Sequence, residues 1–339
     1  MKYRPLIWLC LVFTPVFVGL RIYQLLKTID PTNGFYDNQY SVFTSVILIV
    51  FGACCLLLLL ASRFLIHKSK TPLHLPRKNT ALGMASLLVA AGLIVDVVIE
   101  IRRLSSAMVQ YKNVLYLLSL ITIVAAICFF FIGYRLLCGK GIAPGLSIVV
   151  LIWSTLRLFI RYTVEFNGAA IISENIYDIF ALCGMMMFFL YQSHICASLD
   201  NTKAARWIYG FGLVGSMFCF LVTIPRMALM VTGNAGQLTH SSVPSFGNLA
   251  IGIYILVFLI VLSSRKCQMA LKEDGLEPSK APELEVSTVA GNAEQEVDEQ
   301  DLDAFIRNYK GSDDTEKLLE EEQGTEETSS SEISENGEQ

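Results

Sequence analysis

Eight runs of about twenty largely apolar residues follow one another along this chain, and they limit what it can fold into. A helix rises about 1.5 Å per residue, so about 20 residues cross the hydrocarbon core of a bilayer, which is about 30 Å thick. No water is available there to bind unpaired backbone groups, which leaves helices as the suitable structure for runs of this length. The sequence therefore predicts an all-α, polytopic transmembrane helix bundle of about eight spans. The predicted spans are 5–26, 42–66, 81–103, 114–137, 145–165, 175–197, 206–231 and 246–264.

Composition supports a membrane environment. Hydrophobic residues make up 53% of the chain, charged residues make up 17%, and the mean hydropathy is +0.52. A soluble fold of this size has too little interior to hide so many apolar side chains. We therefore expect the lipid bilayer to be the main partner of the chain, and we expect no nucleic-acid partner.

The charge of the chain is divided between two parts. Residues 273–339 hold 22 acidic and 4 basic side chains, a net charge of −18, whereas residues 1–272 have a net charge of +14. The acidic part is rich in Glu, Ser and Gln, and such a segment buries too little apolar area to offset its ordering entropy. The sequence predicts a transmembrane helical domain over 1–272 and a disordered acidic cytoplasmic tail over 273–339, which offers a surface to a basic protein partner.

Lys and Arg collect in alternate connections between the predicted spans. By the positive-inside rule the connections rich in these residues face the cytoplasm, so both termini are predicted to be cytoplasmic. The opposite connections are poorer in basic residues, although Arg102, Arg103 and Lys112 go against the trend. The basic residues of the cytoplasmic set are Lys2, Arg4, Arg63, Lys68, Lys70, Arg77, Lys78, Arg135, Lys140, Lys203, Arg206, Arg265, Lys266 and Lys272.

Several ionisable residues lie inside the predicted spans, where a charge is costly and needs a partner or a purpose. Counted from the inner ends of their spans, Asp96, Arg157 and Arg226 lie about 22, 18 and 30 Å up, in the outer half of the membrane. The sequence therefore predicts a polar vestibule that is open to the outside. Its candidate ligand-binding residues are Asp96, Glu100, Arg157, Arg161, Asp178 and Arg226.

A packing interpretation of the same charges stays open. Asp96 and Glu100 are four residues apart, as are Arg157 and Arg161, so each pair lies on one helix face. Ion pairs between the two faces would join the third span to the fifth and set their register without binding a ligand. Pro225 precedes Arg226 and interrupts the backbone hydrogen bonds of the seventh span, as in the broken helices of transporter sites.

No motif of a common enzyme class is present. The sequence lacks HExxH, GxSxG, a Walker loop and paired CxxC motifs, so we predict no catalytic residues, no metal site and no cofactor. An intramembrane transferase that uses scattered acidic residues remains an alternative.

Two functions fit these observations. The first is a transporter or sensor that binds a small polar or anionic solute in the vestibule, with the arginines favouring an anionic group. The second is a non-catalytic membrane scaffold whose acidic tail recruits cytoplasmic partners.

The segment IDPTNGFYDNQYSVFTSVILIV, together with the hydrophobic sequence around it, resembles bacterial multi-pass membrane proteins that have no assigned function. The resemblance covers mainly the first two predicted spans. It implies a bacterial cytoplasmic membrane as the location and implies no particular activity.

Overall fold

The computed structural model describes residues 4–27, 41–66, 78–106, 112–166, 173–197, 201–233 and 244–263. The chain divides into two units, Met1–Ser279 and Lys280–Gln339, and all described residues belong to the first. The predicted acidic tail and its boundary at residue 273 lie outside the described residues.

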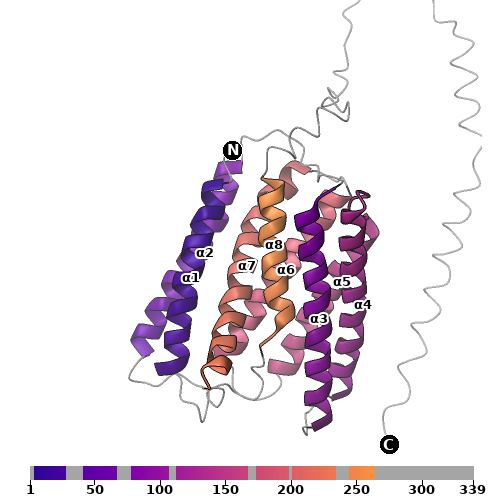
Figure 1. Cartoon of the computed structure of the whole chain (residues 1–339). Coiled ribbons are helices and arrows are strands. Elements are labelled where there is room, and N and C mark those ends of the chain that lie inside the picture. The colour runs from indigo at the N-terminus through magenta and orange to yellow at the C-terminus, as the bar shows by residue number, and fades with distance from the viewer. Residues whose placement is uncertain are drawn as a thin grey trace, which may run out of the picture. The chain divides into compact units, whose positions relative to one another are not determined.

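The predicted all-α fold is confirmed: the described residues form helices and no strand (Figure 1). Seven helices are long and apolar enough to cross a membrane, and the last, of 17 residues, is shorter but equally apolar. These are the lengths and compositions of a multi-pass membrane protein. The helices are α1 (Arg4–Lys27), α2 (Ser41–Ile66), α3 (Thr80–Ser106), α4 (Lys112–Leu137), α5 (Pro144–Phe166), α6 (Ser173–Cys196), α7 (Asn201–Val231) and α8 (Phe246–Leu262).

Six of these helices pack in a closed ring. Going round it, α3 contacts α4, α4 contacts α5, α5 contacts α6, α6 contacts α7, α7 contacts α8, and α8 returns to α3. Helices α1 and α2 pack against α7 from outside the ring, on the side away from α3 and α4 (Figure 1). The ring therefore encloses an axis to which all six helices contribute side chains.

A layer of aromatic side chains fills one half of the ring. Its members come from α4, α5, α6 and α8 and are at most 2% exposed. Their rings meet mostly edge to face, with centroids 5.7 Å apart for Phe129 and Tyr254 and 5.3 Å apart for Phe188 and Phe258. Such contacts add about 0.5–1.5 kcal/mol per pair to the packing energy. The aromatic layer consists of Phe129, Trp153, Phe188, Phe189, Tyr254 and Phe258.

Two glycines bring α6 and α7 into backbone contact. A Cβ atom on Gly184 would lie 2.6 Å from the Cα of Gly215, and one on Gly215 would lie 2.9 Å from the carbonyl carbon of Gly184. Lipid tails are as apolar as the helix surfaces, so close packing between small residues is a main source of helix association in a membrane. The two glycines therefore set the distance between α6 and α7.

Gly184→Ala should destabilise the bundle by about 1–3 kcal/mol, because the added methyl group forces two backbones apart. Thermal unfolding of the purified protein in detergent measures this as a lower midpoint. Gly19→Ala on α1 is the matched control, since a Cβ atom there has no neighbour within 4 Å. Equal midpoints for the two variants would contradict a backbone contact at Gly184.

Candidate functional site

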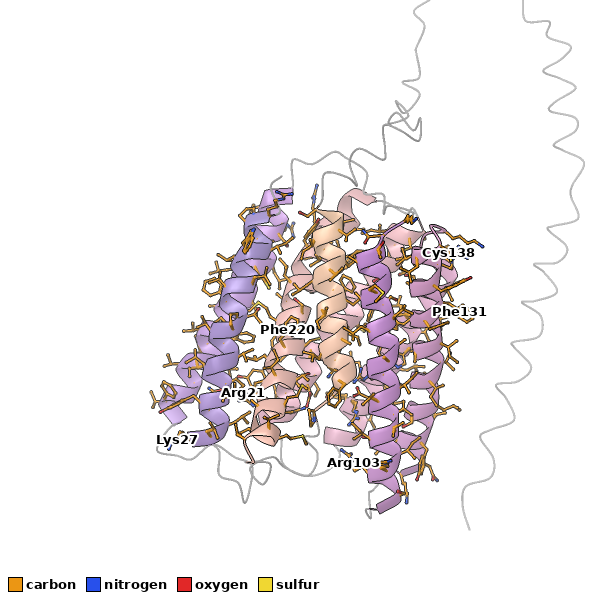
Figure 2. The ribbon with its side chains drawn as sticks, in the orientation of Figure 1. Arg21, Lys27, Arg103, Phe131, Cys138 and Phe220 are labelled. Carbon is orange, nitrogen blue, oxygen red and sulfur yellow. The ribbon has the colours of Figure 1, made fainter. Side chains whose placement is uncertain are left out.

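A partly open cavity of about 90 Å³ lies inside the ring and is lined by all six ring helices. A space of this size holds several water molecules. It lies toward the end of the bundle that also carries Arg103, opposite the end that carries Cys138 (Figure 2). Its polar lining residues are Asp96, Glu100, Arg103, Ser119, Thr122, Arg157, Arg161, Asp178, Arg226, Ser245 and Asn248. All the candidate residues named from the sequence thus meet in one cavity, and their binding of a ligand stays a prediction.

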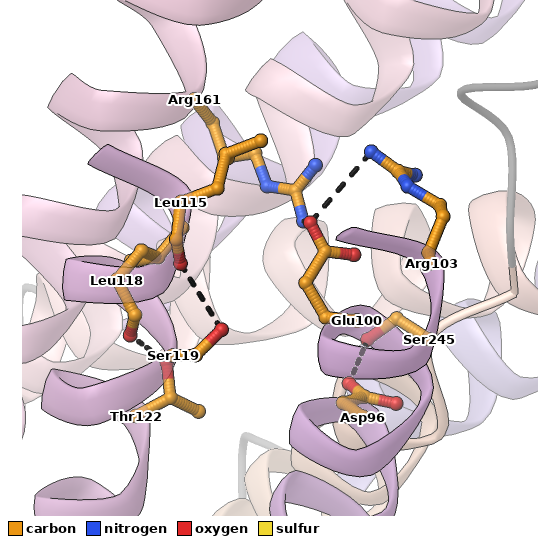
Figure 3. A network of polar contacts seen from close by, with 9 residues as sticks. All are labelled: Asp96, Glu100, Arg103, Leu115, Leu118, Ser119, Thr122, Arg161 and Ser245. Carbon is orange, nitrogen blue, oxygen red and sulfur yellow. Dashed lines mark hydrogen bonds and ion pairs between the residues drawn. The ribbon is translucent and has the colours of Figure 1, made fainter. Parts of the chain in front are cut away.

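Glu100 joins α3 to α5. Its Oε1 atom lies 3.6 Å from a guanidinium nitrogen of Arg161 and 3.6 Å from one of Arg103 (Figure 3). Both separations are those of ion pairs rather than of short hydrogen bonds. This is one of the contacts between the third and fifth spans that the packing interpretation predicts.

Asp96 does not form the other contact. Its carboxylate accepts a hydrogen bond from the Ser245 hydroxyl (Figure 3). It also accepts from the backbone N–H of Phe246 at 2.7 Å and from that of Gly247 at 3.0 Å. The first backbone N–H groups of a helix have no partner within the helix, and a carboxylate is favoured beside them. Among the described residues Asp96 and Arg157 form no direct ion pair, although their charges lie near enough to attract each other, and the N-terminus of α8 supplies the carboxylate with its hydrogen-bond donors.

Asp96 also sets the depth at which α8 begins. It lies ten residues before the end of α3 at Ser106, which places the start of α8 about 15 Å inside that end. The Asp96 carboxylate lies close to the backbone of α8, as a Cβ atom added to Gly247 would be only 2.7 Å from Oδ2 of Asp96. Pro244 and Ser245, which lie directly before α8, line the cavity at this depth.

Arg226 and Asp178 join α7 to α6 through two hydrogen bonds, from Nη2 to Oδ2 at 2.6 Å and from Nη1 to Oδ1 at 3.2 Å. Only 7% of the Arg226 side chain and 19% of the Asp178 side chain are exposed. A two-point contact of this kind is among the stronger polar interactions in proteins. Helix α7 continues through Pro225, so the predicted interruption does not end the helix.

Arg157 differs from the other charged residues of the cavity. Its Nη1 atom is buried and has no hydrogen-bond partner, and its side chain forms no ion pair among the described residues. The guanidinium lies 5.4 Å from the ring centroid of Trp153, whose indole N–H donates to the Thr122 hydroxyl at 3.2 Å. Trp153 belongs to the aromatic layer. Its cation–π contact with Arg157 therefore places the guanidinium where the cavity meets that layer.

Arg21 is a buried charge that the sequence pattern did not indicate. Arg21 is 5% exposed, donates to Gln24 at 3.1 Å and lies over the Tyr177 ring at 4.3 Å. With Arg226 it lines a second, smaller cavity of about 10 Å³. Arg21 lies near the end of the first span, where a basic residue usually reaches the membrane surface. The nearby polar residue Gln24 is the one feature of the sequence that could have indicated its burial. The uncharged lining residues Ser119, Thr122, Ser245 and Asn248 gave no signal, since such residues are common in apolar helices.

Asp96→Asn should lower the free energy of unfolding by about 1.5–3 kcal/mol, because an amide cannot accept from all three donors at the start of α8. Glu100→Gln is the comparison, and its ion pairs at 3.6 Å predict a loss of about 1 kcal/mol or less. The midpoints of thermal unfolding in detergent show which variant loses more stability. A larger loss for Glu100→Gln would contradict the role given to Asp96.

Arg226→Ala should cost about 3–5 kcal/mol, since it leaves the Asp178 carboxylate buried without its partner. The double variant with Asp178→Asn should recover much of that loss, because the remaining group is then neutral. A double-mutant cycle of thermal midpoints tests this, and simple additivity of the two single changes would refute the coupling.

Among the described residues, no group of His, Cys, Asp and Glu side chains is placed to hold a metal ion. Comparison of the chain with protein-family models, with curated proteins and with solved structures gave no match. The resemblance of the first two spans to bacterial multi-pass membrane proteins therefore stays a prediction.

Proposed function

We propose that the ring of helices binds a small monoanion in its cavity, and that the protein is a transporter or sensor of that solute in a bacterial cytoplasmic membrane. The observation that carries the proposal is Arg157, whose Nη1 atom is buried beside the cavity with no hydrogen-bond partner among the described residues. An unpaired charge inside a protein costs several kcal/mol, and a bound anion offsets that cost.

Charge balance supports a ligand with one negative charge. The other candidate residues interact within the protein: Glu100 with Arg161, Asp178 with Arg226, and Asp96 with the N-terminus of α8. Arg157 is thus the one described charge of the cavity without an ion pair or hydrogen bond. Its guanidinium presents a planar fork of donors, which fits a carboxylate or a similar oxyanion.

The uncharged lining supports a ligand that also carries a hydrogen-bond donor. The hydroxyls of Ser119 and Thr122 donate to the carbonyls of Leu115 and Leu118 (Figure 3). The Thr122 oxygen already accepts from Trp153, whereas the Ser119 oxygen is left to accept from a ligand. Oδ1 of Asn248, a residue only 5% exposed, is buried with no partner among the described residues. A small hydroxy acid has both the carboxylate for Arg157 and a donor for these acceptors.

The distribution of charge supports an outward-facing cavity. The end of the bundle away from the cavity carries Arg4, Arg63, Lys78, Arg135, Lys140 and Arg206, and none of the described residues at that end is acidic. The positive-inside rule assigns such an end to the cytoplasm. The aromatic layer lies between it and the cavity, so transport requires these rings to separate, whereas sensing does not.

A membrane scaffold is the second candidate. Most of the buried charges have partners within the chain, which favours a packing role for those residues. In a scaffold, residues 273–339 would carry the function by recruiting a basic protein partner. Deleting 273–339 should abolish a scaffold's function and leave binding in the cavity unchanged.

Arg157→Gln should abolish binding of small carboxylates. Thermal unfolding of the wild type in detergent should show a higher midpoint with lactate, glycolate or acetate, with about 2.7 kcal/mol of added stability at a hundredfold excess over the dissociation constant. Acetamide has the shape of acetate without its charge and should give no shift. The variant should show no shift with any of these compounds.

Arg102→Gln is the matched control, because Arg102 is an exposed arginine of α3 that does not line the cavity. It should keep the full response to carboxylates. An equal response in the Arg157→Gln variant, or no response of the wild type to any monoanion, would refute the proposed site and favour the scaffold.

A further inference from the structure

A second polar surface lies at the opposite end of the bundle, where α2 ends and α7 begins. The exposed side chain of Arg63 lies over the ring of Trp207, with 5.9 Å between its guanidinium carbon and the ring centroid. Arg63 is three residues before the end of α2 and Trp207 is six residues after the start of α7. Both therefore lie within about 9 Å of a helix end, at the depth of lipid headgroups in a spanning bundle.

Trp207 belongs to a stack of three half-buried rings. Phe211 lies 5.6 Å from Trp207 and 6.0 Å from Tyr191, and the planes of Tyr191 and Phe211 are only 9° apart. Tyr and Trp are enriched at membrane interfaces because one side of the ring is apolar and the other can contact polar groups. The stack thus forms a rigid platform beside Arg63.

A second guanidinium near this platform has an unused donor. The Nε atom of Arg206 is buried and has no hydrogen-bond partner among the described residues. Arg206 lies one turn before Gly210, where a Cβ atom would lie 2.6 Å from Oγ of Ser62, so this face of α7 is directed toward the end of α2. Arg206 is also the residue next to Trp207, over which Arg63 lies, so both arginines belong to the junction of α2 and α7.

We infer that Arg63, Arg206 and Trp207 form a binding site for the phosphate headgroup of an anionic phospholipid. The phosphate diester pairs with the two guanidinium groups, and the stacked rings support the glycerol region. Charge complementarity selects this partner, since no described residue at this end of the bundle is acidic. A bilayer also brings phospholipids to this surface at high local concentration. The inference is independent of the proposed anion site in the cavity.

The test compares thermal midpoints of the full chain in phosphatidylcholine nanodiscs with and without phosphatidylglycerol. Phosphatidylglycerol should raise the midpoint of the wild type, and Arg63→Gln should lose more than half of that increase. Arg206→Gln should give a similar loss and serves as the second variant if Arg63→Gln does not fold. Lys140→Gln removes an exposed charge at the same end and should keep the full increase.

Three results would overturn the inference. The first is an unchanged increase in Arg63→Gln and Arg206→Gln. The second is an equal loss in Lys140→Gln, which would indicate attraction by diffuse surface charge. The third is the same increase with glycerol 3-phosphate added to phosphatidylcholine nanodiscs, which would assign the site to a soluble phosphate ester. None of these readouts depends on Arg157 or on carboxylate binding.

Discussion

Hydrocarbon offers no water to a polar group, so each charge on a spanning helix has to be satisfied by protein or by a ligand. In this bundle contacts between helices meet the requirement for most of the described buried charges, and Arg157 is the exception. An ion pair between Asp178 and Arg226 joins α6 to α7, and one between Glu100 and Arg161 joins α3 to α5. Asp96 accepts from the first backbone N–H groups of α8, whose N-cap residue is Ser245. The closed ring therefore depends on its buried charges as well as on its apolar packing.

The cap on α8 has the widest effect on the architecture. Because Asp96 lies well inside α3, a helix that starts there cannot reach the same end of the bundle as its neighbours. The start of α8 lines the cavity through Pro244, Ser245 and Asn248, and the aromatic layer around Trp153 and Tyr254 fills the ring beyond it. Arg157 lies at the boundary between these two regions, with an apolar ring on one side and a polar space on the other.

Much of this arrangement could be predicted from the sequence. Runs of about twenty apolar residues are long enough to specify helices, and charges inside those runs are rare enough to identify the cavity residues. The partner of Asp96 could not be predicted, because Ser245 is 149 residues away and no local pattern gives the depth at which α8 begins. Arg21 was missed for a related reason: its burial depends on Tyr177 and α7, which only the folded structure brings to it.

We propose that water and small anions reach the cavity inside the ring from the outer side of the membrane. Ile99 lines that cavity, while its neighbour Val98 is 46% exposed on the outer surface of the bundle. Single cysteines at these two positions, in a chain whose native cysteines are replaced, can be labelled in intact cells with a membrane-impermeant thiol reagent. Ile99→Cys should react, a bound carboxylate should slow the reaction, and Val98→Cys should stay unlabelled in lipid. Labelling of Ile99→Cys only in inside-out vesicles, or no faster than Val98→Cys, would contradict an outward-facing cavity.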